Sequence, residues 1–395
     1  MELNSFFIYL DLIIFILFSF SVGYVLIYAL ASLKSRNIKY PNSEKLYKIL
    51  VLFPAYKEDI VIINSIESFL KQDYPSTYFD IVVISDNMKK ETNETLNSLS
   101  IKVLEINFEN SSKAKALKYA INNIEDNVYD IVVIMDADNT TDNDYLKQIC
   151  NAFDSGIMAI QTHRVAKNLN TDIAILDAVS EEINNSIFRR GHVNLGVSSA
   201  LIGSGMAFCF KWFKENIHKV VSFVEERELE ILLLRQKLFI EYLEEVKVYD
   251  EKTQTMPIFY KQRKRWLASQ FIVLKMVIKE LPEALFSLNI SYADKIVQWM
   301  LLPRVILLGL IGFISFAISI INITSSVKWW ILLFVLIFSL ALSIPHYLIN
   351  KKLFFAIKKV PLIFAMMVFG IFKIKSASKG FIHTEKNFQN NKIDD

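Results

Sequence analysis

Three long runs without a charged residue constrain the fold of this chain most strongly. The runs cover residues 12–33, 305–327 and 329–350, and the last contains only His346 as an ionisable side chain. A bilayer core of about 30 Å is crossed by roughly 20 apolar residues in a helix, so each run predicts a transmembrane helix. A fourth run, 360–372, is shorter and favours an interfacial or re-entrant helix.

The first run could be either a cleavable signal peptide or a permanent anchor. Ala29-Leu30-Ala31 offers the small residues that a cleavage site needs. Against cleavage, Glu2 stands where a signal peptide carries basic residues, and the run is longer than the usual apolar segment of about 7 to 15 residues. We therefore expect an uncleaved anchor.

Lysine and arginine near the span ends predict the orientation. None precedes Leu12, whereas Lys34, Arg36 and Lys39 follow Leu33, which places the N-terminus outside and the middle segment in the cytoplasm. Residues 351–395 carry nine Lys and three acidic residues and belong on the same side. Three spans are consistent with both the outside N-terminus and the cytoplasmic C-terminal segment, whereas a fourth span would place the lysines at 373, 375 and 379 outside. We expect an integral protein of the plasma (inner) membrane.

The composition indicates a chain with both membrane-embedded and soluble parts. Hydrophobic residues make up 53% of the chain, but 22% of the residues are charged, which is too many for a protein wholly embedded in a membrane. The formal net charge of +3 gives no reason to expect nucleic acid as a partner. Two cysteines, Cys150 and Cys209, exclude a disulfide scaffold and a zinc cluster built from cysteines.

The middle segment has the composition of a soluble domain, in which short β-branched runs alternate with helical stretches. The runs are 49–53, 81–84, 102–106 and 131–135. Their near-continuous apolar character predicts parallel strands that helices bury on both faces, in a doubly wound α/β domain. The expected division is 1–36 (transmembrane helix), 37–270 (cytoplasmic α/β domain), 271–295 (interfacial amphipathic helices), 296–350 (two transmembrane helices) and 351–395 (interfacial or re-entrant helix and Lys-rich cytoplasmic tail).

Acidic residues follow two of the predicted strands. Asp86 follows the second strand, and Asp136-Ala137-Asp138 follows the fourth. Residues i and i+2 of an extended segment project to the same side, so Asp136 and Asp138 can share a hard cation such as Mg²⁺ or Mn²⁺. The alternative is a pair of turn-forming aspartates that close a strand.

Six segments occur in the order typical of one family. They are Pro54-Ala55-Tyr56-Lys57-Glu58, Asp86, Asp136-Ala137-Asp138, Gly203-Ser204-Gly205-Met206, Glu225-Glu226-Arg227-Glu228-Leu229 and Gln262-Arg263-Lys264-Arg265-Trp266. Over about residues 47–270 the chain resembles family 2 glycosyltransferases with a GT-A (Rossmann-like) fold, specifically the membrane-bound polysaccharide synthases related to cellulose, chitin and hyaluronan synthases. Gln-x-x-Arg-Trp just before a membrane region is the most specific of these signals.

The resemblance implies a nucleotide-diphosphate sugar as donor, usually a UDP-sugar, with a divalent cation and inversion at the anomeric carbon. It places the uracil and ribose against Asp86 and the loop with Ala55 and Glu58. It makes Asp138 the metal ligand, with Asp136 beside it and in contact with the donor sugar or ribose. Lys113 matches a donor-binding lysine of the family, although Lys118 replaces the asparagine that usually follows.

The Gln-x-x-Arg-Trp segment reads as one helix face. Gln262, Arg265 and Trp266 stand at i, i+3 and i+4, so an amide, a guanidinium and an indole can meet the pyrophosphate and the acceptor sugar together. Arg263 and Lys264 fall elsewhere on the helix, and we expect them at the membrane surface.

The expected catalytic base departs from the family. Where relatives carry Thr-Glu-Asp, this chain has Val224-Glu225-Glu226. Glu226 is the first candidate for the base and Glu225 the second, and the alternative is that the acidic run only starts a helix. The resemblance places Gly203, Ser204, Gly205 and Met206 beneath the acceptor sugar.

Two further sites stay open in the sequence. The segment 250–252 fits either a gating loop or a surface turn. Arg304, at the start of the second span, is either functional or extends to lipid headgroups.

The leading functional hypothesis is a processive synthase that elongates a polysaccharide from a cytoplasmic UDP-sugar. A single addition onto a lipid-linked acceptor is the main alternative, since three spans are few to enclose a polymer channel. A polymer channel would then need further helices from a homo-oligomer or an accessory subunit. The other expected partners are the growing glycan and membrane lipids. A catalytically silent scaffold and a solute transporter are disfavoured, the first by the complete acidic pair and Gln-x-x-Arg-Trp, the second by the few spans.

Overall fold

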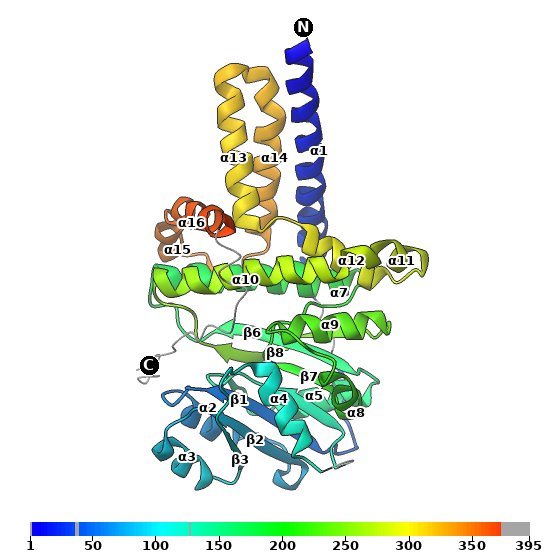
Figure 1. The fold of residues 1–395 in the computed structure, drawn as a ribbon, viewed down its shortest axis with the longest axis vertical. Helices are drawn as coiled ribbons and strands as arrows, with labels where there is room; N and C mark the ends of the chain where they lie inside the picture. The colour runs from blue at the N-terminus through cyan, green and yellow to red at the C-terminus, as the bar shows by residue number, and fades with distance from the viewer. Residues whose placement is uncertain (1, 36–38, 126–127, 373–395) are drawn as a thin grey trace.

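The computed structural model describes residues 2–35, 39–125 and 128–372 and forms an α/β domain below a group of apolar helices (Figure 1). Three long helices, α1 (Glu2–Ala31), α13 (Arg304–Ile321) and α14 (Ile323–Leu342), extend away from the α/β domain. Between the two parts lies a layer of helices that includes α10 (Met256–Val277), α11 (Leu281–Phe286), α12 (Ile290–Met300), α15 (Lys351–Ile357) and α16 (Val360–Phe372).

The α/β domain is built on one mixed sheet of eight strands in the order β3-β2-β1-β4-β7-β6-β8-β5. The strands are β1 Ile49–Tyr56, β2 Phe79–Asp86, β3 Lys102–Ile106, β4 Ile131–Ile134, β5 Thr140–Thr141, β6 Ala159–Ala166, β7 Met206–Cys209 and β8 Ile240–Asp250. The helices of the domain are α2 Ile62–Phe69, α3 Lys90–Asn97, α4 Lys113–Asn122, α5 Tyr145–Asp154, α6 Asp172–Asn184, α7 His192–Asn194, α8 Phe210–Ile217 and α9 Glu225–Arg235.

The four predicted strands are β1 to β4, and they pair in parallel as expected. Their side chains alternate between two cores. Leu50 and Leu52 pack in a core with α4, α8 and α9, whereas Ile49, Val51 and Phe53 pack in a core with α2 and α5. Burial on both faces is why these strands read as continuous apolar runs.

The second half of the sheet was not predicted. β7 lies antiparallel between β4 and β6, while β8 runs parallel to β6. The carboxyl ends of β1, β2, β4, β6 and β8 therefore meet at one edge of the sheet. Because Met206 of β7 pairs with Ile134 at the end of β4, the glycine-rich segment before β7 reaches the same edge.

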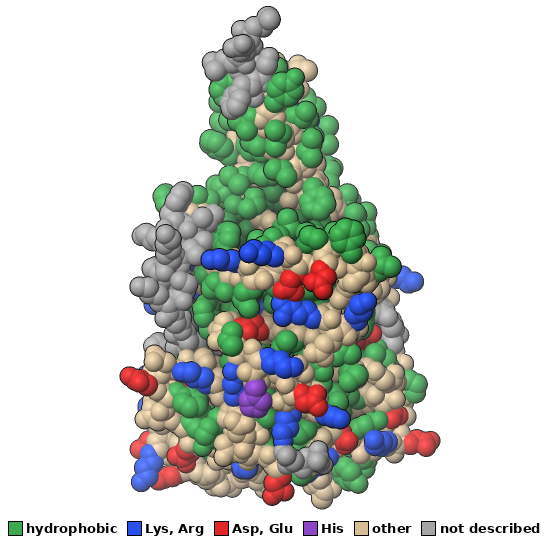
Figure 2. Space-filling model, turned by 45° about the vertical axis from the view of Figure 1, so that its right-hand side comes forward, with side chains coloured by type: hydrophobic (Ala, Val, Ile, Leu, Met, Phe, Trp, Pro, Cys, Tyr) green, Lys and Arg blue, Asp and Glu red, His purple; other side chains and the backbone are tan. Residues whose placement is uncertain are grey.

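Three helices among the described residues are long and apolar enough to cross a membrane, at Phe7–Ala31, Arg304–Ile321 and Ile323–Leu342. A fourth span exists if the pair α15 and α16, bent by 42°, counts as one. Only 28%, 22% and 28% of the three spans is buried within the protein, so most of their apolar surface faces outward. Figure 2 shows this surface as hydrophobic, with the charged side chains gathered below it. The lysine-rich tail lies outside the described residues.

The boundary between α13 and α14 differs from the sequence prediction. It lies at Asn322 rather than at Lys328, because the Asn322 side chain accepts a hydrogen bond from the Ser325 backbone N–H at 3.1 Å and caps α14. Lys328 lies inside α14, where it forms an ion pair with Asp11 of α1. The paired charge explains how the helix continues through a lysine.

Candidate active site

A cavity of about 960 Å³ lies at the carboxyl edge of the sheet, between the α/β domain and α10. Its wall includes residues from the ends of β1, β2, β4 and β8, from the start of α9 and from α10. Eleven of the predicted site residues line it: Ala55, Glu58, Asp86, Lys113, Asp136, Gly203, Glu225, Glu226, Gln262, Arg265 and Trp266. Segments far apart in the sequence thus meet around one space.

Lys113 joins three of the predicted segments. Its Nζ lies 2.5 Å from Asp136 Oδ1 and donates to the backbone oxygen of Gly203 at 2.6 Å. Lys113 is the first residue of α4, and the preceding Ser112 caps that helix by accepting from the Lys115 backbone N–H. A rigid helix start therefore holds the ammonium between the acidic strand end and the glycine-rich segment.

Asp138 lies behind the cavity wall rather than in it. The side chain is buried, and Oδ2 accepts a hydrogen bond from the Glu251 backbone N–H at 3.0 Å. Asn139 Nδ2 donates to Oδ1 at 3.3 Å. The Asp138 carboxylate therefore fixes the chain where β8 ends, and this part of the chain contributes Asp250, Glu251 and Lys252 to the cavity wall.

The donor set at this edge fits a hard divalent cation in its chemistry. Asp136 supplies a carboxylate in the cavity wall and Asp138 a second one directly behind that wall, and Mg²⁺ is usually held by one or two carboxylates plus substrate phosphates. Among residues 2–35, 39–125 and 128–372, no three His, Cys, Asp or Glu side chains are placed to hold a metal together. Further ligands would have to come from a phosphate-bearing substrate.

The glutamates at the start of α9 take two different positions, one that holds the preceding loop and one in the cavity wall. Glu228 accepts from the backbone N–H groups of Val221 and Ser222 at 2.9 and 2.8 Å and so holds the loop before the helix. Glu225 and Glu226 line the cavity instead. Burial, and then the neighbouring Glu226 charge, raise the pKa of the Glu225 carboxyl to about 8. Glu225 is therefore protonated at neutral pH, and Glu226 beside it is only partly buried.

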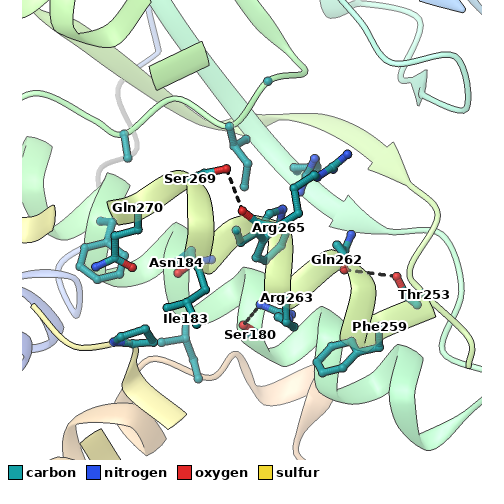
Figure 3. Close-up of a pocket in the computed structure, with 18 of the residues that line it drawn as sticks. Ser180, Ile183, Asn184, Thr253, Phe259, Gln262, Arg263, Arg265, Ser269 and Gln270 are labelled. Atoms are coloured by element: carbon teal, nitrogen blue, oxygen red, sulfur yellow. Dashed lines mark hydrogen bonds between the residues drawn. The ribbon is translucent and has the colours of Figure 1, made fainter. Parts of the chain in front are cut away.

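Helix α10 presents Gln262, Arg265 and Trp266 to the cavity, as its periodicity predicted. Gln262 Oε1 accepts from the Thr253 hydroxyl at 3.3 Å, which ties α10 to the segment after β8. Figure 3 shows Arg265 directed to the side of the helix opposite Arg263. Arg265 and Arg263 thus line the cavity from different sides of α10.

The expectation that Arg263 lies at the membrane surface is wrong. Its guanidinium forms an ion pair with Asp177 of α6 at 2.6 Å, and its side chain is only 12% exposed. It also lies over the rings of Phe259 and Trp266, at 4.6 and 4.3 Å. Burial lowers the pKa of Arg263, and the charge of Asp177 opposes that shift. An acidic partner on another helix, which helix periodicity does not reveal, draws Arg263 inward.

A buried charge network beside the cavity was missed by sequence reasoning. Glu181 accepts from Arg164 at 3.0 Å and from Arg189 at 3.1 Å, and Lys252 bonds Asp250 at 2.9 Å. Burial alone would raise the pKa of Glu181, but Arg164 and Arg189 outweigh it and lower the pKa to about 2. A signal was present, since Asp177, Ser180, Glu181 and Asn184 form one polar stripe at helical spacing on α6.

Gly203 lines the cavity, whereas Ser204, Gly205 and Met206 lie fully buried behind it. Gly205 has φ +63°, and a Cβ there would collide with Thr162 Oγ1. This close approach explains the glycine on structural grounds. Contact of these three residues with an acceptor stays a prediction.

Comparison with known proteins identifies this arrangement. Residues 47–269 match the family described as "Glycosyltransferase like family 2", which covers more than half of the chain. The chain belongs to this family. A curated relative, "Probable glycosyltransferase YdaM" of Bacillus subtilis (strain 168), is 22% identical over 260 residues, which are 60% of this chain and 58% of YdaM. The chain thus spans little more than half the length of that relative.

A solved structure supports the fold of this family 2 glycosyltransferase. The mannosyltransferase PcManGT from Pyrobaculum calidifontis, in complex with GDP-Man and Mn²⁺, superposes with a TM-score of 0.54. The match covers 85% of this chain and 97% of PcManGT at 14% sequence identity. The predicted GT-A fold, with a mixed Rossmann-like sheet and a helical part, is confirmed.

Proposed function

We propose that this chain is a metal-dependent, inverting glycosyltransferase that takes a sugar from a UDP-sugar and elongates a polysaccharide at the cytoplasmic face of the membrane. The observation that carries the proposal is one cavity in which Lys113 and Asp136, the pair Glu225 and Glu226, and the Arg265 side of α10 face a common space. Family membership and the GT-A fold support it.

The donor would lie at the carboxyl edge of the sheet, where ligands bind in open α/β sheets. Ala55, Glu58 and Asp86 form the wall on the β1 and β2 side and are the expected contacts of the nucleoside. Asp136 and Asp138 would hold the divalent cation, Mg²⁺ or Mn²⁺. When bound, that cation neutralises charge on the departing diphosphate. PcManGT binds Mn²⁺ together with its nucleotide sugar, which supports this cofactor class.

Glu226 is the proposed base. In an inverting transfer the acceptor hydroxyl oxygen bonds to the anomeric carbon while the bond from that carbon to the phosphate oxygen breaks. The nucleoside diphosphate leaves with the bonding pair, and the acceptor proton passes to the Glu226 carboxylate. Proton removal by a positioned carboxylate contributes roughly 10²- to 10⁴-fold in rate.

The cationic side chains would act on the leaving group. Arg265 offers a planar fork that fits phosphate oxygens, and Lys113 adds a point charge from α4. Both lie on rigid helices, so they need little reorganisation as charge develops. Trp266 and Gly203 would contact the acceptor sugar.

A second candidate is a single sugar addition onto a lipid-linked acceptor. The observation that favours it is the extent of the cavity, which continues from the site to α13, α14 and α16. In both forms we propose the domain division given above and an N-terminus outside the cell. Figure 1 supports that orientation, since the N-terminus lies at the end of α1 farthest from the α/β domain.

The test is turnover by the purified full-length chain in nanodiscs. A panel of UDP-sugars, with GDP-mannose added, is offered with Mg²⁺, Mn²⁺ or EDTA, and both nucleoside diphosphate release and product length are measured. We expect metal-dependent release with one donor, lost in Asp136→Asn but kept in the exposed control Asp144→Asn. No release with any donor, or release that EDTA leaves unchanged, contradicts the proposal. Long products indicate processive synthesis, and products extended by one sugar indicate the second candidate.

A further inference from the structure

The cavity has a second half that sugar transfer from a nucleotide donor does not need. Beyond α10 the part of its wall that lies toward α14, α15 and α16 is apolar. This wall includes Leu176, Val179 and Ile183 of α6, Ile337, Leu340 and Ile344 at α14, and Ile357, Val360, Ile363 and Met367 of α15 and α16. Sugars and nucleotides are polar, so this half suits a hydrocarbon chain.

Two guanidinium groups lie where the polar and apolar halves meet. Arg263 Nη1 donates to Ser180 Oγ at 3.3 Å, and Arg304 Nη2 donates to the Ser180 backbone oxygen at 3.2 Å. Both arginines line the cavity, one from α10 and the other from the first residue of α13. Figure 3 shows Arg263 directed at Ser180. Two cationic side chains from different helices thus converge on one residue of α6.

Both guanidinium groups retain hydrogen-bonding capacity. Arg263 Nε and Arg304 Nη1 are buried and have no hydrogen-bond partner within the described part of the chain. A buried donor without an acceptor is costly, so natural proteins rarely keep one without a reason. The donors of an arginine fork match the oxygens of a phosphate or a carboxylate.

The charge at this junction is only partly balanced. Asp177 pairs with Arg263, whereas the hydrogen-bond acceptors of Arg304 are the neutral Ser180 carbonyl and the Asn184 side-chain oxygen, the latter at 2.7 Å. Within the described residues, α10 to α16 contribute four cations to the cavity wall, Arg263, Lys295, Arg265 and Arg304, and no carboxylate. Lys295 is already paired with Glu230 at 2.9 Å. Glu181 of α6 also acts on both Arg263 and Arg304, but it is already paired with Arg164 and Arg189, so cations remain in excess on the membrane side of the cavity.

We propose that Arg263 and Arg304 bind the phosphate of a long-chain lipid that carries the acceptor, with its hydrocarbon chain along the apolar half of the cavity. This inference rests on the proposed function and specifies how the acceptor is held. One cavity offers an anion site and an apolar wall side by side, and a lipid phosphate is the class of ligand that fills both. A soluble sugar acceptor would use neither.

The experiment measures binding to the full-length protein in phosphatidylcholine nanodiscs. The probes are farnesyl phosphate, which has both the chain and the anion, farnesol, which has only the chain, and inorganic phosphate, which has only the anion. Affinity is followed by intrinsic tryptophan fluorescence. UDP binding with Mn²⁺ is measured on each sample and reports whether the donor half is intact.

We expect saturable binding of farnesyl phosphate, at least about 10-fold tighter than that of farnesol or phosphate. Arg304→Gln should weaken it by about 10-fold or more, because a charge-assisted hydrogen bond is lost, while Arg304→Lys, which keeps the charge but not the planar fork, should weaken it less than Arg304→Gln. Leu340→Trp should weaken it similarly by filling the apolar half. Lys352→Gln removes an exposed cation of α15 outside the cavity wall and should change nothing.

Two results overturn the inference while UDP binding stays intact. One is a failure of specificity: either farnesol binds as tightly as farnesyl phosphate, or neither Arg304→Gln nor Leu340→Trp changes the affinity for farnesyl phosphate. The other is displacement of farnesyl phosphate by equimolar phosphatidylglycerol, which would make the junction a site for bulk lipid. Failure of the glycosyltransferase function itself has a different signature, since the wild-type chain would then release no nucleoside diphosphate from any donor.

Discussion

Replacing Glu225 by glutamine tests how the two cavity glutamates share their tasks. Glu225 is only 6% exposed, and burial followed by the charge of Glu226 raises its pKa to about 8. Lys113 opposes this shift but does not cancel it. A glutamine has nearly the shape of a protonated glutamic acid, so Glu225→Gln fixes the neutral form at every pH.

The size of the effect follows from linkage. The folded state holds the Glu225 proton up to about pH 8, whereas an unfolded chain releases it near 4.5. A raised pKa means that stability is fully present below pH 4.5 and is lost as the pH rises through 8. At about 1.4 kcal/mol per pH unit, the free energy of unfolding of the wild-type chain falls by about 5 kcal/mol in total between pH 4.5 and about pH 8. The variant avoids this loss.

The assay is thermal unfolding in detergent between pH 5 and 9, followed by tryptophan fluorescence. We expect equal Tm values for the wild type and Glu225→Gln near pH 5, and a higher Tm for the variant at pH 9. Glu225→Gln should also keep most of its transferase rate at pH 7, because Glu225 carries no charge there. Glu226→Gln, the matched change one residue on, should lose roughly 10²-fold or more.

Either of two results refutes this reasoning. Parallel Tm curves for wild type and Glu225→Gln across the pH range would mean that Glu225 is ionised throughout in the folded state. A large loss of rate in Glu225→Gln, with Glu226→Gln active, would move the base to Glu225.

Three further outcomes are expected. Arg265→Lys should lower kcat/KM for the donor by about 10-fold or more in a UDP-release assay, because an ammonium cannot replace the planar fork. Gly205→Ala should lower the Tm by an amount equivalent to about 1–3 kcal/mol, since φ is +63° and the new Cβ meets Thr162; an unchanged Tm would contradict the described loop. Asp11→Asn should lower the Tm by leaving Lys328 without its charged partner inside α14, and adding Lys328→Met should restore it.

Sequence reasoning located the parts of the site that local chemistry determines. The runs at 49–53 and 131–135 are buried on both faces, so they could be recognised as parallel strands, and topology then brings Asp86 and Asp136 to one edge. Helix periodicity predicted that Gln262 and Arg265 share one helix face, and the resemblance to the family placed that face at the cavity, which both residues line. These predictions needed no knowledge of distant partners.

The residues that were placed wrongly or missed depend on partners far away in the chain. Arg263 turns inward because Asp177 lies on another helix, 86 positions earlier. Lys328 stays inside a helix because Asp11 of α1 neutralises it, so the search for uncharged runs placed the helix boundary too late. β7 was not predicted because its four residues pack as an inserted antiparallel strand with no pattern of their own.

The lipid inference and processive synthesis make opposite demands on the acceptor. If Arg263 and Arg304 hold a lipid phosphate while Glu226 removes the acceptor proton, the helices fix the spacing between anchor and reacting hydroxyl. Each added sugar moves the new hydroxyl farther from the phosphate, so a retained anchor limits growth to acceptors of one length. Elongation beyond that length requires the lipid to leave the guanidinium groups. Arg304→Gln should then slow the first addition in a processive enzyme but spare the later ones, whereas in a single-addition enzyme it slows the only step there is.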